Sequence, residues 1–100
     1  MGLAVKWSDR AEWEFDDILN YWNERNGSQR YSTKLINLVN ESIEKLTEYP
    51  DSGQATDNLF VRYKIVKDYF LYYSFDETTL HIVDICDMRR NPEYIKSLLE

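Results

Sequence analysis

The sequence predicts an α+β domain in which a helical hairpin packs on a small, mainly antiparallel, twisted sheet. Apolar residues recur at helical spacing between residues 8 and 50, and after Gly53 the period of the pattern changes from about 3.6 residues to 2. A short strand-like run precedes the first helical segment. One hundred residues suffice for one domain with a single modest core. We therefore expect one domain over residues 1–100 with the element order β-α-α-β-β-β-α.

The first strand is expected over Leu3–Trp7 and leads directly into the first helix. Ser8 and Asp9 supply N-cap oxygens, and Asp9 followed three residues later by Glu12 is similar to a capping box. The helix is expected to end at Gly27, because glycine tolerates the left-handed backbone of a helix C-cap.

Apolar side chains of this first helix recur at i, i+4, i+7 and i+11, which predicts one buried stripe. The stripe consists of Ala11, Phe15, Ile18 and Trp22. The acidic residues of the helix are expected on its solvated face. They are Glu12, Glu14, Asp16 and Asp17.

A second helix is expected to begin after Ser28, which can cap it, and to stop at Pro50. Its apolar stripe consists of Tyr31, Leu35, Leu38, Val39, Ile43 and Leu46. Because the connection between the two helices is short, they are predicted to form an antiparallel hairpin.

Three further strands are predicted by runs rich in Val, Ile, Tyr and Phe, and two tight turns join them into antiparallel hairpins. The runs are Phe60–Val66, Tyr69–Phe75 and Leu80–Cys86. Pro92 suits the first position of a last short helix that ends at Leu99.

The composition excludes several classes of protein. A net charge of −6 argues against indiscriminate nucleic-acid binding, although a local basic patch remains compatible with it. The single cysteine, Cys86, cannot form an internal disulfide or support a metal cluster, and it is interpreted as a small buried residue. No signal peptide and no apolar run of about 20 residues is present. We expect a cytoplasmic protein without cofactor, metal or membrane association.

Five local motifs, in this order of elements, resemble the RelE/ParE superfamily of toxins from type II toxin–antitoxin modules. The motifs are Trp7–Ala11, Tyr49–Gly53, Val61–Tyr63, Tyr69–Tyr73 and Ile85–Pro92. The resemblance covers nearly the whole chain. It implies a compact toxin whose sheet carries the effector site, silenced by a separately encoded antitoxin. It leaves open whether the toxin–antitoxin complex is a heterotetramer.

The superfamily divides into ribosome-dependent mRNA endonucleases and inhibitors of DNA gyrase. Cleavage of mRNA without a metal ion would require a base, cations to stabilise charge at phosphorus, and an acid. The residues that match these roles are Arg62, Lys64, Arg89, Arg90 and Tyr94. Tyr94 is the candidate for proton transfer, since the endonucleases often carry a functional tyrosine or histidine near the C-terminus. The four basic residues would hold phosphate.

Several positions depart from the nuclease pattern. Phe70 stands where the nuclease branch typically carries an arginine, and Cys86–Met88 stands where some members carry a histidine. Asp87 beside Arg89 would also cancel positive charge. We therefore interpret the chain first as a toxin that binds a macromolecular target such as DNA gyrase. An mRNA endonuclease and a non-toxic member that only binds antitoxin are the alternatives.

Aromatic residues of the first helix suggest where the antitoxin binds. Trp13, Tyr21 and Trp22 lie on more than one helix face, which is too many rings for one core of this size. Exposed aromatic residues among polar ones mark partner surfaces. The antitoxin is expected across the helical hairpin and the open sheet edge. His81 is interpreted as an edge-strand residue, and the tyrosines of the Tyr69–Tyr73 motif as mostly core.

Overall fold

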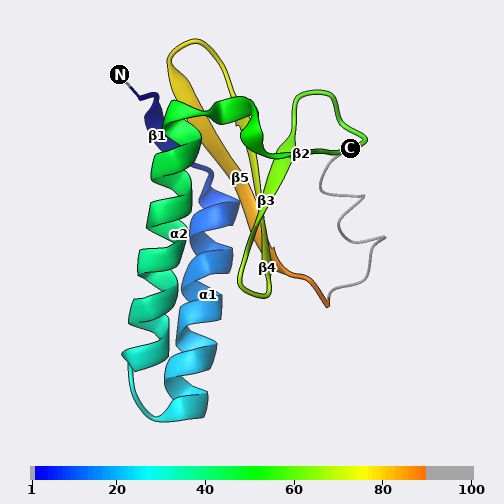
Figure 1. Cartoon of the computed structure of the whole chain (residues 1–100). Helices are drawn as coiled ribbons and strands as arrows, with labels where there is room; N and C mark the ends of the chain where they lie inside the picture. The colour runs from blue at the N-terminus through cyan, green and yellow to red at the C-terminus, as the bar shows by residue number, and fades with distance from the viewer. Residues whose placement is uncertain (1, 90–100) are drawn as a thin grey trace.

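The computed structural model describes residues 2–89. Two helices, α1 (Asp9–Asn26) and α2 (Arg30–Glu48), lie side by side against one face of a five-stranded sheet (Figure 1). The strands are β1 (Ala4–Trp7), β2 (Gln54–Ala55), β3 (Arg62–Val66), β4 (Tyr69–Phe75) and β5 (Thr79–Asp87). A short 3₁₀ helix, η1 (Pro50–Ser52), follows α2. The predicted α+β fold is confirmed, and the expected helix over residues 92–99 lies outside the described residues.

The sheet has the strand order β1-β5-β4-β3-β2. All neighbouring strands are antiparallel except β1 and β5, which run parallel with Ala4 opposite Thr79. The interpretation of His81 as an edge-strand residue is wrong, because β5 lies between β1 and β4. His81 is paired with Lys6 on one side and with Ser74 on the other. The strand β1, which covers this edge of β5, comes from the beginning of the sequence. The local sequence pattern around His81 therefore does not reveal the pairing.

The expected N-cap at Ser8 is confirmed, whereas neither Asp9 nor Ser28 is an N-cap. The Ser8 hydroxyl accepts a 2.9 Å hydrogen bond from the Ala11 N–H, so Ser8 is the N-cap and Asp9 is already the first helical residue. The expected capping box between Asp9 and Glu12 is therefore one residue out of register. Helix α2 begins after Gln29 without a side-chain cap, so the expected cap at Ser28 is also wrong. Gly27 has φ 62°, which confirms the predicted left-handed C-cap of α1.

The main core lies between the helices and the sheet. From α2 it contains Leu35, Val39, Ile43 and Leu46, and from the sheet it contains Val66, Tyr69, Leu71, Tyr73, Leu80, Ile82 and Ile85. A β-bulge in β5 opposite Tyr72 and Tyr73 lets Ile82 and Ile85 join the same core although they are three residues apart. The tyrosines were predicted to be mostly core, and Tyr69, Tyr72 and Tyr73 are 3%, 5% and 0% exposed.

A second, smaller cluster lies on the sheet face opposite the helices, called here the outer face. Its buried members are Val61, Tyr72 and Cys86, and Tyr63, Phe70 and Val83 pack against them. Cys86 is fully buried, as predicted for a small apolar residue.

Glu14 does not lie on the solvated face of α1, where it was expected. It is 3% exposed, because its position on the helix falls between the buried Ala11 and the inward-facing Ile18. Arg10 lies 3.9 Å from the Glu14 carboxylate and 3.7 Å from the carboxylate of Asp84, which is 1% exposed. The sequence pattern did not reveal this buried group of charges.

Candidate functional site

The predicted catalytic residues do not converge on one point in the described part of the chain. Arg62 is opposite Tyr73 at one end of β4, whereas Arg89 follows Asp87, which is opposite Tyr69 at the other end. The four residue steps from Tyr69 to Tyr73, at about 3.3 Å each, separate these two ends of the site by roughly 13 Å along the sheet. Arg90 and Tyr94, which were predicted to join them, lie outside the described residues.

Arg62 and Lys64 share one face of β3, as their two-residue spacing predicts, and it is the face that carries the helices. Their cross-strand partners are Tyr73 and Leu71, both members of the main core. Arg62 donates a 3.0 Å hydrogen bond to the Gly53 carbonyl, so its guanidinium ties β3 to the chain that leads into β2. Lys64 lines a shallow hollow against α2.

Arg89 is paired with the carboxylate two residues before it. Its Nε and Nη2 donate to the two carboxylate oxygens of Asp87 at 3.0 and 2.7 Å, and its backbone N–H donates to the same carboxylate at 2.8 Å. The hydrogen bond and the charge of Asp87 raise the pKa of the Arg89 guanidinium. The expected cancellation of charge is confirmed, because Nε and Nη2 of the guanidinium are already hydrogen-bonded to a carboxylate of the same chain.

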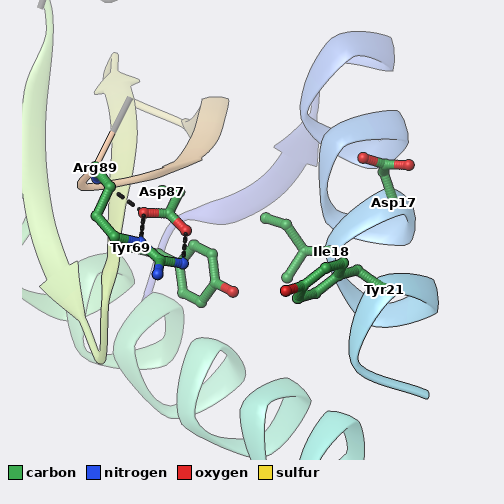
Figure 2. A pocket seen from close by; sticks show the side chains of 6 residues that line it. All are labelled: Asp17, Ile18, Tyr21, Tyr69, Asp87 and Arg89. Atoms are coloured by element: carbon green, nitrogen blue, oxygen red, sulfur yellow. Dashed lines mark hydrogen bonds and ion pairs between the residues drawn. The ribbon is translucent and has the colours of Figure 1, made fainter. Parts of the chain in front are cut away.

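Beside this ion pair, α1 and the end of the sheet enclose a hollow of about 380 Å³. We call it the α1–β4 hollow. It is lined by Asp17, Ile18 and Tyr21 from α1, and by Tyr69, Asp87 and Arg89 from the sheet side. Figure 2 shows Ile18 and Tyr21 extending from α1 toward Tyr69, with the Asp87–Arg89 pair on the opposite side. The hollow therefore combines apolar walls with a charged rim.

The floor of the α1–β4 hollow is fixed by aromatic contacts. The Trp22 indole N–H donates a 2.7 Å hydrogen bond to the Tyr69 hydroxyl, and the Trp22 ring packs on Tyr31 at 4.7 Å between centroids. Burial raises the pKa of the Tyr69 phenol above its ordinary value. Trp22 thus points inward and is part of the support of the hollow.

Trp13, Asp17 and Tyr21 follow one another at intervals of four residues and form an exposed row along α1, called here the α1 strip. Trp13 is 64% exposed and Tyr21 is 50% exposed. The strip runs into the α1–β4 hollow, because Asp17 and Tyr21 line that hollow too. Two of the three aromatic residues predicted to bind a partner therefore lie on a continuous accessible surface.

A family profile described as "ParE toxin of type II toxin-antitoxin system, parDE" matches residues 5–92. The chain belongs to the ParE toxin family. The resemblance to the RelE/ParE superfamily is thereby confirmed, and this ParE-family protein is the toxin component of a type II toxin–antitoxin system. Its partner is an antitoxin.

The fold of this ParE-family toxin is also found among solved structures. A structure titled "Chromosomal ParDE TA system from P. aeruginosa" matches it with a TM-score of 0.72 and 16% sequence identity. The match covers 85% of this chain and 95% of the other chain. No curated protein sequence matches.

The outer face of this ParE-family toxin carries a cluster of aromatic rings. Phe70 packs edge-on against Tyr63 at 5.3 Å between centroids, and Tyr72 lies 6.0 Å from both rings. Burial raises the pKa of Tyr72 to about 12, which makes it a poor proton donor or acceptor near neutral pH. Within residues 2–89 no group of three or more His, Cys, Asp or Glu residues could hold a metal ion. No helix in that range is long and apolar enough to cross a membrane.

Sequence reasoning missed the α1–β4 hollow and the role of Asp17 in it. The spacing of Trp13, Asp17 and Tyr21 is visible in the sequence and could have shown the strip. The far wall could not be found in this way, because Tyr69 and Asp87 are brought there by strand pairing.

Proposed function

We propose that this ParE-family toxin arrests growth by binding a protein target, with DNA gyrase as the leading candidate, and not by cutting mRNA. The observation that carries the proposal is the pairing of Arg89 with Asp87. This pairing occupies one of the four basic residues that were predicted to hold phosphate. Arg62 and Lys64 support the same conclusion, since both lie on the helix-facing side of the sheet. A toxin with this target would act in the cytoplasm.

Two measurements on the same protein test this proposal. The purified toxin is added to a supercoiling reaction with DNA gyrase, and the 5′ ends of cellular mRNA are mapped after induction. We expect inhibition of supercoiling and no codon-phased cuts. Codon-phased cuts with normal supercoiling would instead identify a ribosome-dependent endonuclease. Unchanged growth after induction would identify a non-toxic member that only binds antitoxin.

The antitoxin was expected across the helical hairpin and the open sheet edge. We narrow this proposal to the α1 strip and the α1–β4 hollow. The strip offers two exposed rings, and the hollow offers apolar walls beside a charged rim. These features fit a protein segment that carries apolar side chains, because buried aromatic anchors dominate binding energy at interfaces. Binding at this surface is compatible with a heterotetrameric toxin–antitoxin complex.

The antitoxin surface is tested with the double variant Trp13→Ser/Tyr21→Ser and the product of the neighbouring antitoxin reading frame. We expect the affinity to fall about 100-fold, since two interface anchors worth at least 1 kcal/mol each are removed. Tyr49→Ser is the matched control, because Tyr49 is an equally exposed aromatic residue (65%) at the far end of α2. Equal affinities of the double variant and the wild type would contradict the proposal, and the mass of the complex gives its stoichiometry.

A further inference from the structure

The loop between β2 and β3 exposes two large apolar side chains at its tip. Leu59 is 93% exposed and Phe60 is 81% exposed, which makes them the most exposed large apolar residues in residues 2–89. Single exposed apolar residues are common, but two neighbours at the end of a projecting loop need a reason. Figure 1 shows this loop extending from the side of the molecule away from the helices. We call it the Leu59–Phe60 turn.

The Leu59–Phe60 turn is held in one conformation by its own polar groups. The Thr56 hydroxyl lies 2.8 Å from the Val61 carbonyl and accepts a 3.1 Å hydrogen bond from the Asn58 N–H. The Asn58 side-chain oxygen accepts a 2.9 Å hydrogen bond from the Phe60 N–H, and the Asn58 carbonyl accepts one from the Val61 N–H at 3.1 Å. Because the backbone is fixed before binding, little conformational entropy would be lost when the two side chains enter a partner.

A hollow of about 490 Å³ lies next to the turn, at the end of the sheet where β3 and β5 begin and β4 ends. Phe75, 39% exposed, adds a third apolar side chain to its wall. The polar groups there are engaged within the chain: Arg62 donates to the Gly53 carbonyl, and His81 lies 3.1 Å from Asp76. The Asp76 carboxylate also accepts hydrogen bonds from the backbone N–H groups that follow it.

We propose that the Leu59–Phe60 turn is the surface that binds the toxin's target. The target is a protein whose apolar cleft receives the side chains of Leu59 and Phe60. This rests on the proposed function. The eight residues 54–61 contain one charged residue, Asp57, and no cation. The next residue, Arg62, lines the adjacent hollow, but its guanidinium donates a hydrogen bond to the Gly53 carbonyl. A nucleic acid would need cations on this surface to neutralise its phosphates, whereas a protein cleft needs apolar side chains.

The turn is separate from the surface assigned to the antitoxin. Phe75 ends β4 beside the turn, and Tyr69 begins β4 in the α1–β4 hollow. Six residues of strand at about 3.3 Å each separate the two sites by roughly 20 Å. Substitution of the turn should therefore remove the action on the target and leave antitoxin binding intact.

The test is the double variant Leu59→Ser/Phe60→Ser, with Tyr49→Ser as the matched exposed control. Growth arrest after induction, inhibition of purified DNA gyrase and affinity for the antitoxin are measured, and circular dichroism and the thermal midpoint check folding. We expect the double variant to be folded, to bind antitoxin as the wild type does, and to lose about 100-fold in inhibitory potency, since two large side chains no longer become buried. The control should keep full potency.

Growth arrest by the folded double variant at the wild-type dose would overturn the inference while leaving the proposed function in place. A loss of growth arrest accompanied by the loss of codon-phased mRNA cuts made by the wild type would also overturn it, because the partner would then be ribosome-bound RNA. A wild-type protein that does not arrest growth would instead refute the proposed function, and the inference with it.

Discussion

The Trp22 indole N–H donates a 2.7 Å hydrogen bond to the hydroxyl of Tyr69 and so joins α1 directly to β4. The two residues lie 47 positions apart in the chain. Their contact forms the base of the α1–β4 hollow, whose opposite rim is the Asp87–Arg89 pair. The geometry of the surface assigned to the antitoxin thus depends on a bond beneath that surface.

Removal of the Tyr69 hydroxyl should destabilise the fold. Tyr69→Phe leaves the Trp22 indole N–H without its acceptor in a part-buried position, and we expect a loss of about 1–2 kcal/mol in the free energy of unfolding. Urea denaturation measures it. Trp13→Phe, at an exposed position, is the control and should change stability by less than about 0.5 kcal/mol. Equal stabilities of Tyr69→Phe and the wild type would show that this bond does not contribute.

The buried tyrosines predict a loss of stability in alkali. Burial raises the pKa of Tyr72 from 10.0 to about 12, so the folded state holds the phenolic proton more tightly than the unfolded state. The stabilisation is complete below pH 10 and is lost as the pH rises from about 10 to about 12, because only the unfolded chain releases the proton there. Tyr72→Phe should flatten this decline by up to about 2 kcal/mol.

Denaturation curves recorded between pH 8 and pH 11.5 measure the effect of Tyr72. Tyr49→Phe, an exposed tyrosine, should leave the decline unchanged. The prediction fails if Tyr72→Phe and Tyr49→Phe have the same dependence on pH.

Arg10 should matter for folding more than its exposure suggests. It lies within 4 Å of the buried carboxylates of Glu14 and Asp84, and Arg10→Met would leave both with less compensating charge. Removal of one partner from a fully buried ion pair lowers the free energy of unfolding by about 3–5 kcal/mol. The Arg10 side chain is 46% exposed and solvent screens its charge, so we expect Arg10→Met to lower it by about 1–2 kcal/mol. Thermal denaturation with Arg25→Met as the surface control tests this. The prediction is contradicted if Arg10→Met lowers the thermal midpoint no more than Arg25→Met does.

Introduction of an arginine on the outer face should not create a nuclease. Phe70→Arg places a cation among Tyr63 and Tyr72, yet Arg89 stays paired with Asp87. Loss of one preorganised charge stabiliser costs about 3–4 kcal/mol in a transition state, and one added cation does not supply the missing acid and base. Mapping of 5′ ends after induction should show no codon-phased cuts for the wild type or the variant. Cuts made by Phe70→Arg alone would show that this position was the sole obstacle.

The sequence was sufficient for the elements whose pattern is local. Helix α1 ends at Gly27 as expected, and β4 has the expected bounds, because periodicity and glycine conformation act over a few residues. The strand β3 begins two residues later than predicted, since the Phe60 and Val61 N–H groups bond within the turn. The two-residue strand β2 is too short to have a readable period.

The site was less predictable than the fold because it is assembled from distant segments. The pairing of Arg89 with Asp87 could be anticipated, since the two residues are neighbours in sequence. The approach of Asp84 to Arg10 could not, because Asp84 reaches α1 only through the bulged strand β5. Trp22 was assigned both to the buried stripe of the first helix and to a partner surface, and its hydrogen bond to Tyr69 places it on the inward side.

The parallel pairing of β1 with β5 has a consequence for the synthesis of this toxin. Ala4 is opposite Thr79, so 75 residues must be made before the first strand finds its place. Contacts of such long range form late, whereas the α1–α2 hairpin can form from residues that emerge together. The nascent chain would therefore carry its helices before its sheet is closed. A newly translated toxin can close its sheet only after β5 has been made, which leaves an interval in which the helical hairpin is accessible and the sheet is still unfinished.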